Sequence, residues 1–178
     1  MKKILQILTL LIISVSNTDA QSHHVNFSIG PEYSLPTFSG ISSCGIGAGI
    51  SIEHFFNKRV EGVVAVSYGY FKGDVFDFYK NDTIKGFAVM PVLLGIKYFV
   101  SDKFYVSGAA GMVVGVHNAG NHLALSPGIG FLIPFSPHSK IDAGVKLIGI
   151  PRGYSFSENS FLNKGGYSYL TFKIAYIF

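Results

Sequence analysis

The chain has 178 residues, enough for one domain of ordinary size. Only 13% of its residues are charged, whereas 15% are aromatic and 21 are glycine; typical soluble domains have about 25% charged residues. The formal net charge is +4 and the basic residues are scattered, with Lys58 and Arg59 the only adjacent pair after the N-terminus, which argues against nucleic-acid binding and against charge-driven binding to a membrane surface.

Residues 1–20 have the pattern of an export signal. Lys2 and Lys3 precede the apolar run ILQILTLLII, and small residues, Thr18 and Ala20, follow it. We therefore expect a signal peptide over residues 1–20, cleaved between Ala20 and Gln21. The remaining residues, 21–178, are expected to form the folded domain.

From residue 23 onward, apolar residues alternate with small or polar residues at a period of two. This period is typical of β-strands with one apolar face. In the second stretch, Ile46, Ala48, Ile50 and Ile52 alternate with glycine, serine and Glu53. We count eight such stretches, whose alternating residues span 23–33, 43–56, 60–71, 86–99, 104–116, 123–133, 141–147 and 165–178.

The connections between these stretches alternate in length. NKR, SDK and SPHSK are short, whereas residues 34–43, 72–85, 117–122 and 150–166 form longer loops. The pattern is typical of an up-and-down meander, and eight antiparallel strands can close into a barrel without free edges. The mean hydropathy is +0.38, yet the later apolar stretches are shorter than the roughly 20 residues of a membrane-spanning helix. We predict an all-β, eight-stranded antiparallel up-and-down transmembrane β-barrel.

The composition of the two strand faces predicts which face points outward. One face is rich in glycine, alanine and serine, which suit the narrow interior of a small barrel better than a water-facing surface. The large apolar face is therefore expected to meet lipid, although a water-soluble sandwich with a tyrosine-rich core remains an alternative. Tyrosines near the strand ends are expected to form the aromatic belts: Tyr33, Tyr68, Tyr70, Tyr98, Tyr154, Tyr167 and Tyr176.

Charged residues on the small face predict a blocked lumen. Three acids and three bases fall on inward positions in the same half of the barrel: Glu53, Glu61, Lys97, Asp142, Lys146 and Lys173. Because an ion inside a barrel is costly without a partner, we expect these six to form a salt-bridge cluster. Glu32 is expected to stand apart, within reach of water or Lys72. The alternative is that some of these side chains face lipid head groups at strand ends.

Three features carry a resemblance to a known family: the export signal, the segment MPVLLGIKYFVSDKFYVSGAAGM, and a last strand whose apolar residues are spaced by two. With them, residues 22–178 resemble the small outer-membrane β-barrel proteins of Gram-negative bacteria, often labelled the porin family and similar in size to OmpX and the OmpA membrane domain. The resemblance implies an outer-membrane location and contact with outer-membrane lipids and lipopolysaccharide. It also implies that the barrel-assembly machinery reads an assembly signal formed by Phe172, Ile174, Tyr176 and Phe178.

Some barrels of this kind are enzymes that modify lipid A, and such an enzyme needs a nucleophile with a base beside it. His122 and Ser126 share a face but lie four strand residues apart, about 13 Å, whereas a nucleophile and its base need about 2.6–3.2 Å. The segment VHNAGNH around His117 lacks the His-x-Ser pair of the deacylases. The histidines show no metal-ligand spacing, and Cys44 is the only cysteine. We therefore expect neither catalysis, nor a metal, nor a cofactor.

Two long loops carry aromatic residues among charges, GDVFDFYKNDTI and PRGYSFSENSFLNKGG. They suit either contact with an extracellular ligand or with lipopolysaccharide, or packing over the barrel mouth. The predicted function is that of an integral outer-membrane barrel with a filled lumen and a structural or surface-interaction role. A small or gated pore is the first alternative, and a lipid A-modifying enzyme is the second.

Overall fold

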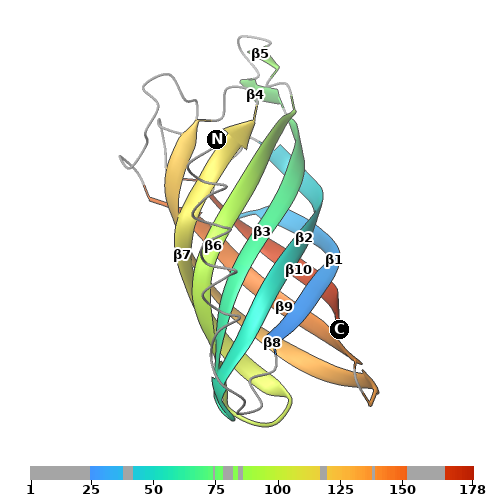
Figure 1. Ribbon diagram of the computed structural model, residues 1–178. Coiled ribbons are helices and arrows are strands. Elements are labelled where there is room, and N and C mark those ends of the chain that lie inside the picture. Colours follow the sequence, from blue (N-terminus) through green and yellow to red (C-terminus); the bar gives the residue numbers. More distant parts are fainter. Residues whose placement is uncertain are drawn as a thin grey trace, which may run out of the picture.

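The computed structural model is a closed antiparallel β-barrel (Figure 1). It describes residues 25–37, 42–73, 75–77, 82–83, 86–116, 120–137, 139–151 and 167–178, so the predicted signal peptide and its cleavage point lie outside the described residues. The barrel strands are β1 (Val25–Pro36), β2 (Ser42–Asn57), β3 (Val60–Gly73), β6 (Phe87–Phe99), β7 (Phe104–Val116), β8 (Asn121–Ser136), β9 (Ser139–Ile150) and β10 (Tyr167–Ile177). The predicted all-β, eight-stranded fold is confirmed.

Pairing of the first strand with the last closes the barrel. The β1–β10 ladder runs from Ser28 opposite Ile177 to Pro36 opposite Tyr169. One further hydrogen bond extends it, from the Phe178 N–H to the Phe27 carbonyl at 3.0 Å. Every barrel strand therefore has two neighbours, as the predicted meander requires.

Two connections differ from the prediction. Residues 72–85, expected to be a loop, include a separate two-stranded sheet of β4 (Val75–Asp77) and β5 (Asp82–Thr83), which lies beyond the end of the barrel (Figure 1). The predicted long loop 117–122 is shorter, because the β7–β8 ladder continues to Val114 opposite Asn121. Gly120, directly before β8, has a φ of 72°, which favours glycine.

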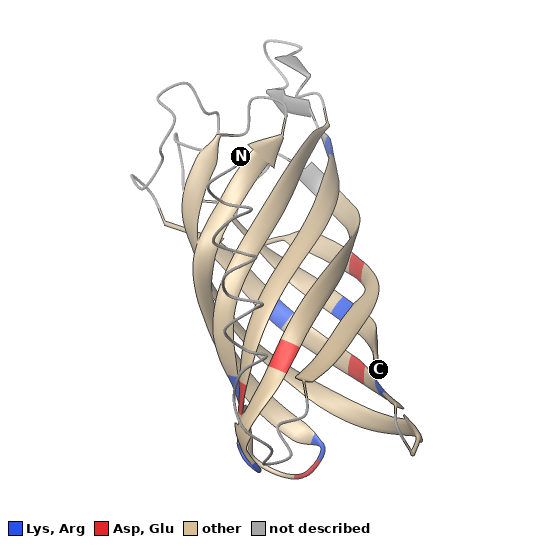
Figure 2. Ribbon diagram, viewed as in Figure 1, with Lys and Arg blue, Asp and Glu red and all other residues tan. Residues whose placement is uncertain are grey.

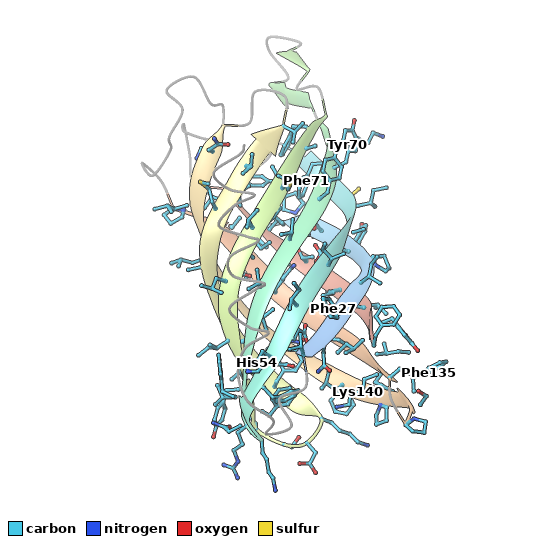
Figure 3. All side chains as sticks on the ribbon, viewed as in Figure 1. Phe27, His54, Tyr70, Phe71, Phe135 and Lys140 are labelled. Atoms are coloured by element: carbon cyan, nitrogen blue, oxygen red, sulfur yellow. The ribbon has the colours of Figure 1, made fainter. Side chains whose placement is uncertain are left out.

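The outer surface of the barrel is apolar, as the alternation predicts. Exposed large apolar side chains project outward along seven of the eight barrel strands, and Figure 3 labels Phe27, Tyr70 and Phe135 among them; on β9 the residues of the same parity, Ile141, Val145 and Leu147, are half-buried. Ile46, Leu94 and Ile174 are 65%, 65% and 61% exposed. Within the described ranges, no helix is long and apolar enough to span a membrane. An apolar belt around the whole barrel is the surface that a hydrocarbon environment requires.

Most of the predicted belt tyrosines face outward, but Tyr167 does not. Its side chain is only 1% exposed and lies inside the barrel. The reason is strand parity: Tyr167 shares its face with the buried residues Tyr169 and Thr171. Its position near a strand end was therefore the wrong criterion, and the prediction for Tyr167 is wrong. Tyr154 lies outside the described residues.

The apolar belt gives a first prediction. Leu94 and Val100 are 65% and 60% exposed, but Leu94 lies within β6, whereas Val100 follows the end of that strand. In a bilayer, Leu94→Arg is expected to lower the free energy of unfolding by about 2–4 kcal/mol and Val100→Arg by about 0–1 kcal/mol. Denaturant unfolding in lipid vesicles measures both values. Equal losses in the two variants would contradict a membrane-embedded belt.

Candidate functional site

Lys97 is at the centre of a charged network inside the barrel. Its Nζ lies 2.7 Å from Glu53 Oε2, 3.2 Å from Asp142 Oδ2 and 3.6 Å from Glu61 Oε2. The four side chains come from β6, β2, β9 and β3, and all are buried. Figure 2 shows charged positions on several strands in the half of the barrel that carries the short turns. The network therefore joins, across the lumen, strands that are far apart in the sequence.

A second cation and two hydroxyl groups complete this network. Lys173 Nζ lies 2.9 Å from Asp142 Oδ2, and the Tyr105 hydroxyl donates a hydrogen bond of 2.6 Å to Asp142 Oδ1. The Ser51 hydroxyl donates to Glu53 Oε1 at 2.8 Å. A buried carboxylate is tolerated when its oxygens are paired in this way. Tyr105 is buried on the inward face of β7, and sequence reasoning did not identify it as a partner of Asp142.

Lys146 does not join the other five residues of the predicted cluster. Its Nζ lies 2.7 Å from Glu32 Oε1. Along β9, Lys146 is four residues from Asp142, about 13 Å. Glu32 was expected to stand apart, near water or Lys72, and that expectation is wrong. The strands of a barrel are tilted and staggered, so equal counts from the turns do not give equal heights in the lumen.

The acids in the lumen outnumber the bases. Among the described residues, four buried or nearly buried carboxylates face three lysines in these two groups. Glu61 is the least satisfied, because its Oε2 atom has no hydrogen-bond partner among the described residues and its ion pair with Lys97 is the longest in the network. We therefore expect stability to depend most strongly on Lys97, the cation that three of these carboxylates share.

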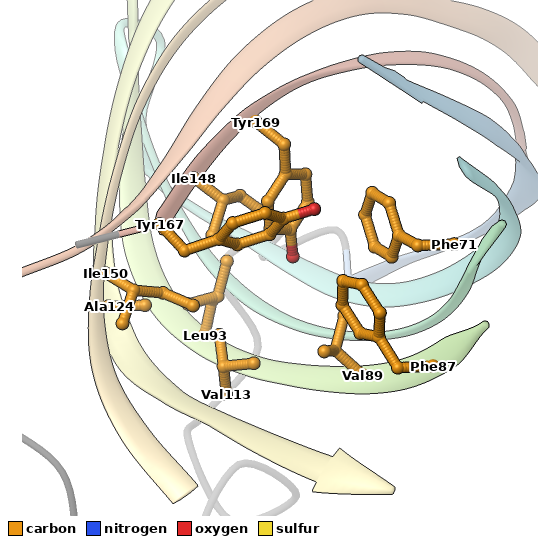
Figure 4. Packing of buried hydrophobic residues seen from close by; sticks show 10 residues of the cluster. All are labelled: Phe71, Phe87, Val89, Leu93, Val113, Ala124, Ile148, Ile150, Tyr167 and Tyr169. Atoms are coloured by element: carbon orange, nitrogen blue, oxygen red, sulfur yellow. The ribbon is translucent and has the colours of Figure 1, made fainter. Parts of the chain in front are cut away.

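A loop-end apolar layer fills the part of the lumen beside the long connections (Figure 4). The rings of Phe71 and Phe87 stack with centroids 5.2 Å apart, and Tyr169 packs edge-on to Phe71 at 5.0 Å. A Cβ atom at Gly45 would lie 2.7 Å from Phe71 Cδ1, so this glycine makes room for the ring. The layer consists of Phe71, Phe87, Val89, Leu93, Val113, Ala124, Ile148, Ile150, Tyr167 and Tyr169.

A turn-end apolar layer closes the other side of the charged network. It consists of Phe55, Phe99, Tyr105, Leu132 and Ile177. Phe99 lies 5.5 Å from Phe55 and 5.6 Å from Tyr105, measured between ring centroids. Between the layers there is a cavity of about 80 Å³, with room for only a few water molecules.

Sequence reasoning did not predict these two layers, because it described the inward face by its small and charged residues and drew no conclusion from the large ones. A usable signal was present in strand parity. Phe71 shares the face of Glu61, and Phe87 shares the face of Lys97, at an even spacing along each strand. Large residues on the inward parity at strand ends therefore indicated an internal apolar filling.

The residues considered for catalysis do not form a catalytic pair. His122 and Ser126 are both buried on the inward face of β8, but their separation along one strand is about 13 Å. His117 lies outside the described residues. Within the part of the chain that the structure describes, no three His, Cys, Asp or Glu side chains are arranged to hold a metal ion.

Comparisons with known proteins show the fold. No protein-family model matches the sequence, and no curated protein matches it significantly. Neisserial surface protein A (NspA) is similar in structure with a TM-score of 0.60 at 13% identity, covering 88% of this chain and 98% of that chain. Ail of Yersinia pestis, solved with the heparin analogue sucrose octasulfate, has a TM-score of 0.53 at 15% identity, covering 89% and 100%. The chain has the fold of these small eight-stranded outer-membrane β-barrels.

The network gives a second prediction. Lys97→Met leaves three buried carboxylates without their shared cation and is expected to lower the free energy of unfolding by about 3–5 kcal/mol. Lys146→Met is the control, because it removes one ion pair, that with Glu32. Adding Glu53→Gln to Lys97→Met is expected to recover part of the loss. Denaturant unfolding in vesicles measures all three variants, and equal losses for the two lysine variants would contradict the central role of Lys97.

Proposed function

We propose that this protein is an integral outer-membrane barrel of a Gram-negative bacterium, with a closed lumen and a structural or surface-interaction role. One observation carries the proposal: two apolar layers and the Lys97 network leave a cavity of only about 80 Å³ in the lumen. We therefore expect neither a substrate site nor a continuous water path in the described part of the lumen. The function of the protein is then expected to lie on its surfaces.

The lengths of the connections support an orientation in the membrane. Outer-membrane barrels have short periplasmic turns and longer extracellular loops. Here β2–β3, β6–β7 and β8–β9 are joined by short turns, and β1 begins and β10 ends at that same end of the barrel. We assign this end to the periplasm and the long connections to the cell surface.

The long connections are the proposed interaction surface. The aromatic and charged residues of GDVFDFYKNDTI and PRGYSFSENSFLNKGG suit contact with lipopolysaccharide or another ligand. Most of these residues lie outside the described ranges, so the assignment is argued from their sequence. Ail, which has the same fold, was solved with the heparin analogue sucrose octasulfate, which supports an interaction role.

Planar-bilayer recording tests the closed lumen. Purified protein that shows heat-modifiable gel mobility is expected to insert without producing discrete conductance steps. The competing function, a small or gated pore, is favoured by the three lysines that line the cavity, Lys97, Lys146 and Lys173. Discrete steps that disappear in Lys146→Ala or Lys173→Ala would establish that pore. Recovery of the mature protein in the periplasm, soluble without detergent, would contradict the membrane assignment itself.

The last strand gives a further prediction. Phe172, Ile174, Tyr176 and Phe178 all face outward, and we propose that the barrel-assembly machinery reads them. Deletion of Phe178 is expected to reduce the amount of assembled barrel in the outer membrane more than it reduces the unfolding free energy of barrels already formed. Phe135→Ala is the control, because Phe135 is an exposed aromatic residue that contacts Tyr176, with ring centroids 6.0 Å apart. Normal outer-membrane levels of the deletion variant would overturn the assignment.

A further inference from the structure

Basic residues that are scattered in the sequence lie at the same end of the barrel. Lys58 and Arg59 form the β2–β3 turn, Lys103 precedes β7, and Lys140 follows the first residue of β9. All four are exposed, and we call them the basic rim. Their hairpins are consecutive around the barrel, because β2, β3, β6, β7, β8 and β9 are neighbours in that order. Figure 2 shows basic positions at these turns.

Hydrogen bonds hold the turns of the basic rim in place. Asn57 Oδ1 accepts hydrogen bonds from the Arg59 and Val60 N–H groups at 2.8 and 2.9 Å. The Arg59 carbonyl accepts from the Phe99 N–H at 2.8 Å, and the Lys103 carbonyl accepts from the Leu132 N–H at 2.7 Å. The first two turns are therefore each tied to the next hairpin, and Lys140 is held in the β9 ladders opposite Pro134 and Ile177.

The basic rim carries an excess of positive charge that the lumen does not use. Among the described residues of the three turns and their flanks (57–59, 100–103, 136–137, 139–140), the four cations face a single acid, Asp102. Glu53 and Glu61 lie deeper, buried beside Lys97. The rim is therefore a positively charged surface at the end of the barrel that we assign to the periplasm.

Each of the three hairpin tips also exposes a large apolar side chain. Phe56 precedes the first turn, Val100 begins the second and Phe135 lies near the third, and they are 61%, 60% and 67% exposed. Figure 3 shows Phe135 and Lys140 on the same hairpin. An apolar side chain beside a cation suits a membrane interface, where the first enters the acyl region and the second reaches the head groups.

We propose that the basic rim binds the phosphate groups of anionic phospholipids in the leaflet that the short turns face. Lysine and arginine near an anionic membrane surface are attracted to it, whereas zwitterionic lipids give no net attraction. The neighbouring apolar side chains favour a lipid over other phosphates or acidic polypeptides, which would leave Phe56, Val100 and Phe135 in water. The inference rests on the proposed membrane insertion and orientation.

The preference of the rim for anionic over zwitterionic phospholipids can be measured as the number of each lipid that the protein retains. The folded barrel is placed in nanodiscs with equal amounts of phosphatidylglycerol and phosphatidylethanolamine of the same acyl chains, and native mass spectrometry counts the lipids that stay bound. The wild type is expected to retain phosphatidylglycerol about threefold over its share of the bilayer. The rim variant, K58Q/R59Q/K103Q/K140Q, is expected to lose this preference, and the smaller variant K58Q/R59Q to lose part of it.

The controls distinguish binding at the rim from a general attraction between the positively charged protein and anionic lipids. K72Q removes one charge at the end of β3 opposite the rim and is expected to leave the preference unchanged, whereas the matched single variant K58Q is expected to reduce it. Raising NaCl from about 0.03 M to about 1 M is expected to abolish the wild-type preference. Inorganic phosphate at constant ionic strength is expected to have no effect, and displacement of the lipid by it would overturn the lipid assignment.

Failure of the rim proposal can be told apart from failure of the proposed membrane insertion. A barrel that inserts but retains both lipids in their bulk ratio, or a rim variant that keeps the wild-type preference, would overturn the rim proposal alone. A protein that does not insert into the nanodisc would overturn the proposed membrane function together with the rim.

Discussion

The pairing of β1 with β10 is the constraint on which the rest of the structure depends. Once Ser28 lies opposite Ile177 and the ladder continues to Pro36 and Tyr169, every barrel strand has two partners. A sheet without edges satisfies its backbone donors and acceptors internally, which is what a hydrocarbon environment demands. Closure also divides the side chains into an outer set and an inner set, because successive residues point to opposite faces. The apolar belt and the filled lumen both follow from that division.

The filling of the lumen reflects the small radius of an eight-stranded barrel. Side chains from facing walls are close enough to touch, so Lys97 on β6 reaches Glu53 on β2 and Asp142 on β9. Charges at this depth require partners, and apolar layers on both sides leave beside them a cavity of about 80 Å³, with room for only a few water molecules. The charged network holds particular side chains together in the interior, whereas the apolar layers fill the lumen on both sides of that network. The two together support the proposed closed lumen.

Features that depend on the alternation of residues along a strand could be predicted from the sequence. Contacts that depend on the stagger of one strand against another could not. Strand number, pairing order and the outward positions of residues such as Leu94 follow from a period of two and from connection lengths. The pairing of Glu32 with Lys146 depends on the tilt of the strands, which counting from the turns does not supply. Tyr167 was assigned by its nearness to a strand end, although its parity already placed it inside. The basic rim was missed because its four residues come from three turns that only the closed barrel makes neighbours.

Hydrogen–deuterium exchange in lipid vesicles tests closure most directly. Along β1 and β10, alternate amides point toward the seam between these two strands. If the barrel is closed, the amides of β1 and β10 exchange as slowly as those of β6 and β7, which lie far from the seam in the strand order. Rapid exchange of about half of the amides in β1 and β10, as at two free edges, would contradict a closed barrel.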